Sequence, residues 1–142
     1  MLGKHTETVI QDVDIPIENG AAFLDFFHRE IGIKPIWICP IHAYDENHSY
    51  DLYRLDPSKI YVNFGFWDVV RSRRKLPKGH YNRRIESQIA KLGGIKSLYS
   101  DSFYPPEIFW QIYNKPTYDR LKAKYDPQQV LQDLYQKCVL RA

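Results

Sequence analysis

Hydrophobic residues between positions 9 and 101 follow two different spacings. Stretches in which every second residue is apolar are typical of half-buried strands, and stretches with apolar residues three or four positions apart are typical of helices. Asn19 is suited to begin the first helical stretch, and Gly32 is suited to end it. The pattern predicts, in order, a strand over 9–17, a helix over 23–31, strands over 36–39 and 60–67, a helix over 85–92 and a strand over 95–101.

Helical spacing continues towards the C-terminus in three shorter stretches. Pro105 and Pro106 open the first, where a proline removes no helical hydrogen bond, and Lys115-Pro116 separates it from the second. The run Asp126–Gln129 resembles a capping box and begins the third. The side chains expected to face inward are Ile108, Phe109, Ile112 and Tyr113, then Tyr118, Leu121 and Tyr125, then Val130, Leu131, Leu134 and Cys138.

The order of the first six elements, β-α-β-β-α-β, is that of the ferredoxin-like, or split βαβ, pattern. We therefore expect one α+β domain over residues 1–142, with an antiparallel sheet, helices on one face and further helices at the C-terminus. A chain of this length can bury roughly 70% of its unfolded surface, which is enough for a core of its own. The two longest irregular stretches, 42–58 and 71–79, are expected to be surface loops.

The strand residues divide into two sets because neighbouring side chains point to opposite faces of a sheet. One set is wholly apolar and is expected beneath the helices: Ile36, Ile38, Ile60, Val62, Phe64, Phe66 and Leu98. The other set mixes aromatic and polar side chains around a glycine: Trp37, Cys39, Tyr61, Asn63, Gly65, Trp67, Tyr99 and Asp101, joined by Asp12 and Asp14. Such a mixture is typical of ligand and interface surfaces, although the C-terminal helices could instead cover this face.

Composition narrows the classes of protein that fit. With 44% hydrophobic and 26% charged residues the chain has a globular composition, and its 15% aromatic content suits either a face for a ligand or a core filled by rings. No apolar run approaches the ~20 residues of a membrane-spanning helix, and the N-terminus lacks the features of a secretory signal. The two distant cysteines favour a reducing, cytoplasmic location, with membrane association left open.

Three groups of side chains could suggest a metal site, a nucleophile or an anion-binding surface, but each has a simpler structural interpretation. The run His42-x-x-Asp45-Glu46-x-His48 matches no standard ligand spacing, so we expect a solvated loop and no metal. Cys39 lies near His42 without a third orienting group, which favours packing over nucleophilic catalysis. The basic run Arg71–Lys75, with Lys78, Arg83 and Arg84, could contact nucleic acid, an acidic membrane or a cofactor phosphate, but solvated cations are the simpler interpretation.

Several stretches resemble one known family when they are taken together. They are Gln11-Asp12-x-x-Ile15-Pro16, Lys34–Pro40, Gly94-x-x-x-Leu98-Tyr99-Ser100-Asp101-x-Phe103, Glu107-x-Phe109-Trp110, and Tyr118-x-x-Leu121-Lys122-x-Lys124. The chain resembles the C-terminal region of the FAD-dependent Δ24-sterol reductase (Diminuto/seladin) family. Lys124-Tyr125-Asp126-Pro127 also resembles a run found more broadly in FAD-linked oxidases of the vanillyl-alcohol-oxidase type.

The resemblance implies a cap that covers the flavin ring and helps to shape the pocket for a small-molecule substrate. It also implies that FAD is bound mainly by an upstream domain, because no glycine-rich phosphate loop is present here. Alone, such a piece is expected to be folded, colourless and inactive. Residue by residue, the resemblance reaches only Tyr99 and Asp101, which match the family's run expected near the flavin. Together with the mixed strand set, it gives Tyr99, Tyr61 and Asp101 as catalytic candidates for a hydride transfer, and Trp37, Asn63 and Tyr99 as cofactor-binding candidates.

A different class of function uses the same face. A free-standing ferredoxin-like module could bind RNA or another protein through Tyr61, Trp67 and Tyr99, on which bases could stack. The acidic residues Asp12, Asp14 and Asp101 among these rings would repel phosphate, so nucleic acid is not the expected partner.

Overall fold

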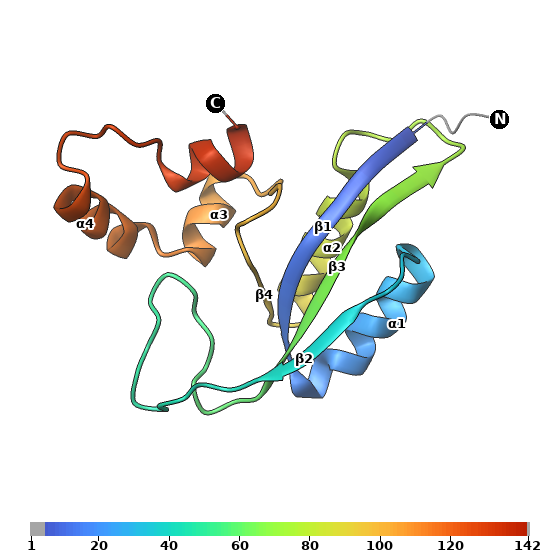
Figure 1. The fold of residues 1–142 in the computed structure, drawn as a ribbon, viewed down its shortest axis with the longest axis horizontal. Helices are drawn as coiled ribbons and strands as arrows, with labels where there is room; N and C mark the ends of the chain where they lie inside the picture. The colour runs from blue at the N-terminus through green and yellow to red at the C-terminus, as the bar shows by residue number, and fades with distance from the viewer. Residues whose placement is uncertain (1–4, 142) are drawn as a thin grey trace.

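A computed structural model describes residues 5–141 as an open antiparallel sheet with helices (Figure 1). Four strands, β1 (His5–Pro16), β2 (Trp37–Ile41), β3 (Tyr61–Ser72) and β4 (Ile95–Lys96), pair in the order β2-β3-β1-β4. The helices α1 (Gly20–Glu30) and α2 (His80–Lys91) connect β1 to β2 and β3 to β4, and the short 3-10 helix η1 (Ile17–Asn19) precedes α1. The expected α+β class with an antiparallel sheet is confirmed.

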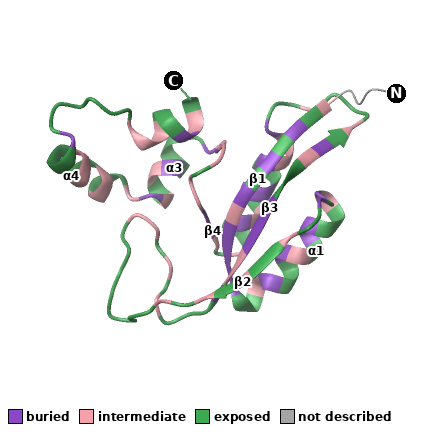
Figure 2. Ribbon diagram, viewed as in Figure 1, coloured by how far each residue is buried: buried purple, intermediate pink, exposed green. Residues whose placement is uncertain are grey.

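The main core lies between the sheet and the two connecting helices. Val13 pairs with Phe64 across β1 and β3, and both side chains are buried against α1 and α2. The rings of Phe27 and Phe66 pack with centroids 4.4 Å apart. Figure 2 shows this burial along β1 and β3. The helical spacing of apolar residues therefore predicted the buried faces of α1 and α2 correctly. The helix residues in this core are Phe23, Phe26, Phe27, Ile85 and Ile89.

Of the two residues predicted to begin and end α1, only the glycine at its end acts as expected. Gly32 has a φ of 75°, and its backbone nitrogen donates to the oxygen of Phe27 at 2.9 Å, which ends the helix as expected. Asn19 occupies the first cap position, but its side chain makes no cap hydrogen bond. Its Nδ2 donates instead to the backbone oxygen of Leu92 at 3.0 Å, which ties the start of α1 to the end of α2.

A second, smaller core joins the C-terminal segment to the opposite face of the sheet. The C-terminal segment contains α3 (Pro106–Ile112), α4 (Lys115–Tyr125) and the π-helix η2 (Gln136–Leu140), and this core takes side chains from α3 and η2. Ile95 lies on the face opposite α1 and α2 because it pairs with Asp14, and it packs in the same cluster as Phe109 and Tyr113. The C-terminal helices therefore cover this face only at its β4 edge. None of the helices within residues 5–141 is long and apolar enough to cross a membrane.

The predicted strand over 95–101 is wrong beyond its first two residues. Lys96 is fully buried, and its ammonium group donates to the Glu86 carboxylate at 3.1 Å and to the backbone oxygen of Asp101. The same carboxylate accepts a hydrogen bond from the backbone nitrogen of Phe103 at 3.0 Å. These bonds fold residues 97–103 back over the buried pair, so the chain leaves the sheet. Leu98 then packs in the second core, not beneath α1 and α2.

The predicted last helix also begins later than its sequence pattern indicates. The Asp126 carboxylate accepts hydrogen bonds from the backbone nitrogens of Val130 and Leu131, at 2.9 and 3.0 Å. These bonds hold a loop, because local side-chain acceptors compete with helical bonds. Four apolar residues expected to face inward are exposed here and in α3 and α4: Ile108, Tyr125, Val130 and Leu131.

Two residues of the apolar strand set are exposed as well. Ile38 lies on β2, which is an edge strand, and Ile60 comes just before β3. Neither side chain packs in the main core, so the alternation of apolar residues in these strands did not predict their exposure.

Candidate functional site on the open sheet face

The sheet face opposite α1 and α2 presents its side chains in rows across the strands. One row contains Trp37, Gly65 and Asp12, because Gly65 pairs with both of the others. The next row, towards the β3 start, contains Cys39, Asn63 and Asp14 in the same way. Most of the mixed set predicted from the strand alternation thus lies together on one face.

Gly65 makes the first row hollow at its centre. A Cβ placed on Gly65 would lie 2.5 Å from Oδ1 of Asp12 and 3.3 Å from Cβ of Trp37. A side chain there would collide with the carboxylate, so glycine lets Asp12 lie across the backbone of β3. The result is a shallow position with an indole on one side and a carboxylate on the other.

Tyr99 completes this row from the segment after β4. Its hydroxyl donates to the Asp12 carboxylate, and the backbone nitrogen of Ser97 donates to the backbone oxygen of Asp12 at 2.9 Å. Partial burial, the negative charge of Asp12 and this hydrogen bond together raise the pKa of Tyr99 to about 12. Although 61% of the residue is exposed, the phenol thus holds its proton more tightly than an ordinary tyrosine does.

The second row holds a buried carboxylate. Asp14 is 3% exposed, and it accepts hydrogen bonds from Nδ2 of Asn63 at 2.8 Å and from the Tyr53 hydroxyl at 2.7 Å. The Tyr53 hydroxyl also lies 3.3 Å from Oγ of Ser97. Burial, followed by the charge of Asp14, raises the pKa of Tyr53 well above its usual value. This network fixes Asn63 in place and links the sheet to the 42–60 loop.

Four large side chains on this face remain exposed and form what we call the aromatic platform. They are Ile10, Trp37, Trp67 and Tyr99, with exposed fractions of 40%, 60%, 58% and 61%. Ile10 pairs with Trp67 in the row beyond Gly65. Exposed apolar side chains that gather around a carboxylate are typical of a surface that meets a ligand or another domain.

Of the other two catalytic candidates, Tyr61 lies away from this platform, whereas Asp101 lines a pocket of about 450 Å³ together with Ile10 and Tyr99. Tyr61 is 6% exposed, and its phenolic oxygen accepts a hydrogen bond from the backbone nitrogen of Asp56 at 3.1 Å. It lies four residues from Gly65 along β3, roughly 13 Å away. Asp101 is half-buried and forms an ion pair with Arg141. The structure therefore brings Trp37 and Tyr99 together, with Asn63 one row away.

Two members of the site were not singled out from the sequence. Asp12 was placed on this face, but nothing local indicated that it, and not Asp101, would orient Tyr99. Tyr53 lies in a stretch with no periodic pattern, so its hydrogen bond to Asp14 across 39 positions gave no sequence signal. No group of three or more potential metal-ligating side chains occurs within residues 5–141; Nε2 of His42 lies 3.8 Å from the Glu46 carboxylate.

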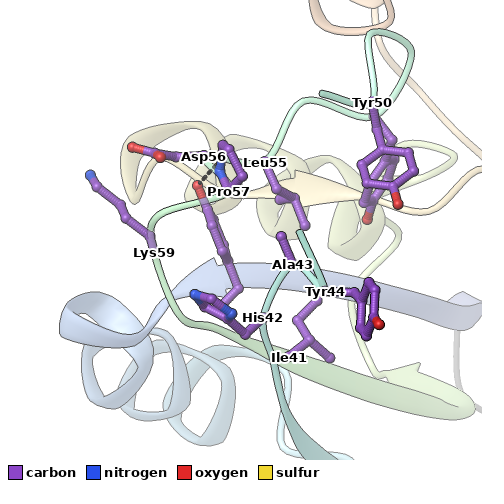
Figure 3. Close-up of a pocket in the computed structure, with 11 residues that line it drawn as sticks. Ile41, His42, Ala43, Tyr44, Tyr50, Leu55, Asp56, Pro57 and Lys59 are labelled. Atoms are coloured by element: carbon purple, nitrogen blue, oxygen red, sulfur yellow. Dashed lines mark hydrogen bonds between the residues drawn. The ribbon is translucent and has the colours of Figure 1, made fainter. Parts of the chain in front are cut away.

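A pocket of about 280 Å³ lies beneath the 42–60 loop, at the Tyr61 end of the same face. Figure 3 shows its mainly apolar and aromatic wall, with His42 and Lys59 on one side. The wall contains Ile41, Ala43, Tyr44, Tyr50, Tyr53, Leu55, Asp56, Pro57 and Tyr61 besides these two residues. Tyr53 belongs both to this wall and to the Asp14 network, so the pocket adjoins the second row.

Comparison with known proteins identifies similar sequences of one kind. This chain is 26% identical to a Δ24-sterol reductase homologue of Caenorhabditis elegans and 24% identical to the Δ24-sterol reductase of Mus musculus. Each of these two alignments spans 129 residues, which is 91% of this chain. The Δ24-sterol reductase of Arabidopsis thaliana matches 94% of the chain at 22% identity. These matches confirm the resemblance drawn from the sequence.

The chain spans about a quarter of the length of these relatives, 24%, 25% and 26% respectively. No protein-family model matches it, and no solved structure matches it.

Proposed function

We propose that this chain is the C-terminal, substrate-side portion of an FAD-dependent oxidoreductase, and that its open sheet face covers the flavin ring. The similarity to Δ24-sterol reductases over 91% of the chain supports the enzyme class. The observation that carries the covering role is the aromatic platform, which lies uncovered around the Asp12–Tyr99 pair. We assign the β2-β3-β1-β4 sheet with its two connecting helices to the ferredoxin-like arrangement as part of this proposal.

The residues present fit the ring of the cofactor better than its phosphates. A flat aromatic ring can lie against Trp37 and Tyr99, and the glycine at position 65 leaves room for close approach. The Asp12 and Asp14 carboxylates would repel a diphosphate, and the sequence has no glycine-rich phosphate loop. An upstream FAD-binding domain of the same protein would therefore hold the rest of the cofactor.

This chain's own residues would orient groups and hold one proton. When bound, the flavin supplies hydride exchange with the substrate. Tyr99 is protonated at neutral pH, as an ordinary tyrosine is, so its hydroxyl can donate a hydrogen bond to a substrate atom, or a proton to a strongly basic one; its raised pKa of about 12 makes it a weaker acid than a free phenol. Asp12 would position that hydroxyl, and Trp37, which is 60% exposed in the chain alone, would shield the row from water once the flavin covers it.

The pocket beneath the 42–60 loop would receive part of a small-molecule substrate. Its wall is largely apolar, and it lies on the platform face next to the Asp14 network. The relatives are named for the reduction of Δ24-sterols, so a Δ24-sterol is the first probe to use. Base stacking is less well supported, because Tyr61, one of its three proposed rings, is buried.

The test is to purify the product of the complete gene, to measure its bound flavin, to reduce that flavin with dithionite, and then to follow its reoxidation by a Δ24-sterol. We expect one bound flavin, and we expect Tyr99→Phe to slow turnover about 100-fold while flavin content stays unchanged. Tyr125→Phe is the matched control, because Tyr125 is exposed on α4 and should leave turnover unchanged. A gene product without flavin would contradict the proposal.

A further inference from the structure

The positive charge of the chain is concentrated in one segment. Residues 73–91 carry seven lysines and arginines and a single acidic residue, Glu86, for a charge of 7 − 1 = +6. The whole chain has 20 basic and 17 acidic residues, so the other residues carry 13 − 16 = −3. The small net charge of +3 is therefore the sum of a strongly positive segment and a negative remainder of the chain.

These cations form what we call the basic surface, on the loop between β3 and α2 and along α2. Figure 1 shows this loop at the end of β3, where it leads into α2. The basic surface consists of Arg73, Arg74, Lys75, Lys78, Arg83, Arg84 and Lys91. A groove of about 440 Å³ between α1 and α2 runs from Pro77 to Lys91 and contains Arg83 and Arg84 in its wall.

Most of the basic surface has no acidic partner. Arg84 binds Glu30 at 2.7 Å, and Arg83 donates to the backbone oxygen of Phe103 at 2.7 Å. Within residues 5–141 the other five cations make no ion pair, and all five are exposed: Arg73, Arg74, Lys75, Lys78 and Lys91. Unpaired cations so close in sequence repel one another, and a polyanionic surface would relieve that repulsion.

We propose that the basic surface docks the chain on an anionic phospholipid membrane. Clusters of four to eight lysines and arginines are the usual footprint for such a surface, and this cluster lies within that range. Leu76 and Pro77 lie among the cations of this loop, so the loop also carries apolar side chains for the headgroup layer. This inference is independent of the proposed enzymatic function, because it uses none of the platform residues.

The composition of the basic surface favours a membrane over the other polyanions. Single-stranded RNA needs free rings for stacking, but the Phe103 ring lies beneath Arg83, at 5.2 Å, and Tyr81 packs edge-on against His80. A protein partner needs an apolar centre, and the loop offers only Leu76 and Pro77. A broad charged layer needs neither of these features.

The proposed docking leaves the other face of the sheet accessible. α1 and α2 pack on the sheet face that carries Val13 and Phe64, whereas Asp12 and Gly65 point to the opposite face. A chain that lies on a membrane through α2 and its preceding loop therefore keeps the aromatic platform directed away from the headgroups.

The test measures cosedimentation of the full chain with phosphatidylcholine vesicles prepared with and without phosphatidylserine. We expect binding only when phosphatidylserine is present, and weaker binding at higher salt. The triple variant Arg73→Glu, Arg74→Glu, Lys75→Glu should lose binding on the order of 100-fold. The matched control is Arg120→Glu, Lys124→Glu, Lys137→Glu, which changes the net charge equally on exposed residues of the C-terminal segment.

Circular dichroism and thermal unfolding of each variant establish that it is folded before its binding is compared. Selective loss in the first triple variant supports the proposal. An equal loss in both triple variants would overturn it, because net charge alone would then explain binding. Binding that does not depend on phosphatidylserine would overturn it too, as would binding to an RNA oligonucleotide with none to the vesicles.

Discussion

The carboxylate of Asp12 lies across Gly65, with Oδ1 only 2.5 Å from the place where a Cβ on that glycine would be. Gly65→Ala should therefore displace the carboxylate from Tyr99. Because the colliding atom ends a short side chain that can rotate, we expect a change in the free energy of unfolding of no more than about 1 kcal/mol. Denaturant unfolding measures the stability, and NMR titration of labelled tyrosines measures the Tyr99 pKa. A Tyr99 pKa still near 12 in this variant would contradict the described contact.

Asp12→Asn tests the same pair without any change in volume. The charge of Asp12 and its hydrogen bond both raise the pKa of Tyr99. Their removal should lower that pKa from about 12, but it should stay above the ordinary value of 10.0 because burial, the largest cause of the shift, remains. Tyrosine NMR titration, with Tyr99→Phe to assign the signal, follows the shift. Asp101→Asn is the control and should leave the Tyr99 pKa in place.

Much of the sheet could be predicted because its signals are local. The alternation in β1 and the helical spacing of Phe23 and Phe27 depend only on neighbouring residues, and both report the buried side correctly. Strand parity also places Trp37 on the aromatic platform correctly, whereas Tyr99 reaches the platform from a segment that is not a strand. What could not be predicted depends on distant partners: Tyr61 is buried beneath the 42–60 loop, and no property of β3 alone indicates this.

The wrongly predicted elements have the same explanation. Residues 97–101 have a strand-like pattern, but the buried Lys96–Glu86 pair draws this stretch out of the sheet. Val130 and Leu131 have a helical spacing, but the Asp126 carboxylate binds their backbone nitrogens in a loop. In both cases one charged side chain overrides the local hydrophobic pattern.

Lys96→Met should be strongly destabilising. Lys96 is 0% and Glu86 4% exposed at the side chain, and the variant would leave the Glu86 carboxylate buried without its cation. We expect a loss of about 3–5 kcal/mol in the free energy of unfolding, measured by urea denaturation. Adding Glu86→Gln should recover part of this loss, because the buried charge is then removed. Lys91→Met, at an exposed position of α2, should change stability by less than about 0.5 kcal/mol.

Stability should fall in alkaline solution. Burial raises the pKa of Tyr53, Tyr104 and Tyr113 well above their usual value of 10.0. Above pH 10 an unfolded chain releases these phenol protons while the folded chain keeps them, so the unfolded state gains stability as the pH rises. Urea unfolding at a series of pH values measures this effect. Tyr113→Phe should make the decrease less steep, whereas Tyr125→Phe should not, and a stability that is flat above pH 10 would be the contrary result.

The most direct test of the covering role is time-resolved flavin fluorescence in the product of the complete gene. An indole or phenol in contact with an excited flavin shortens its emission by donating an electron. We expect Trp37→Leu to lengthen the flavin lifetime and Trp110→Leu, in the second core, to leave it unchanged. Identical lifetimes in the unmodified protein and in both variants would show that this face does not lie over the flavin.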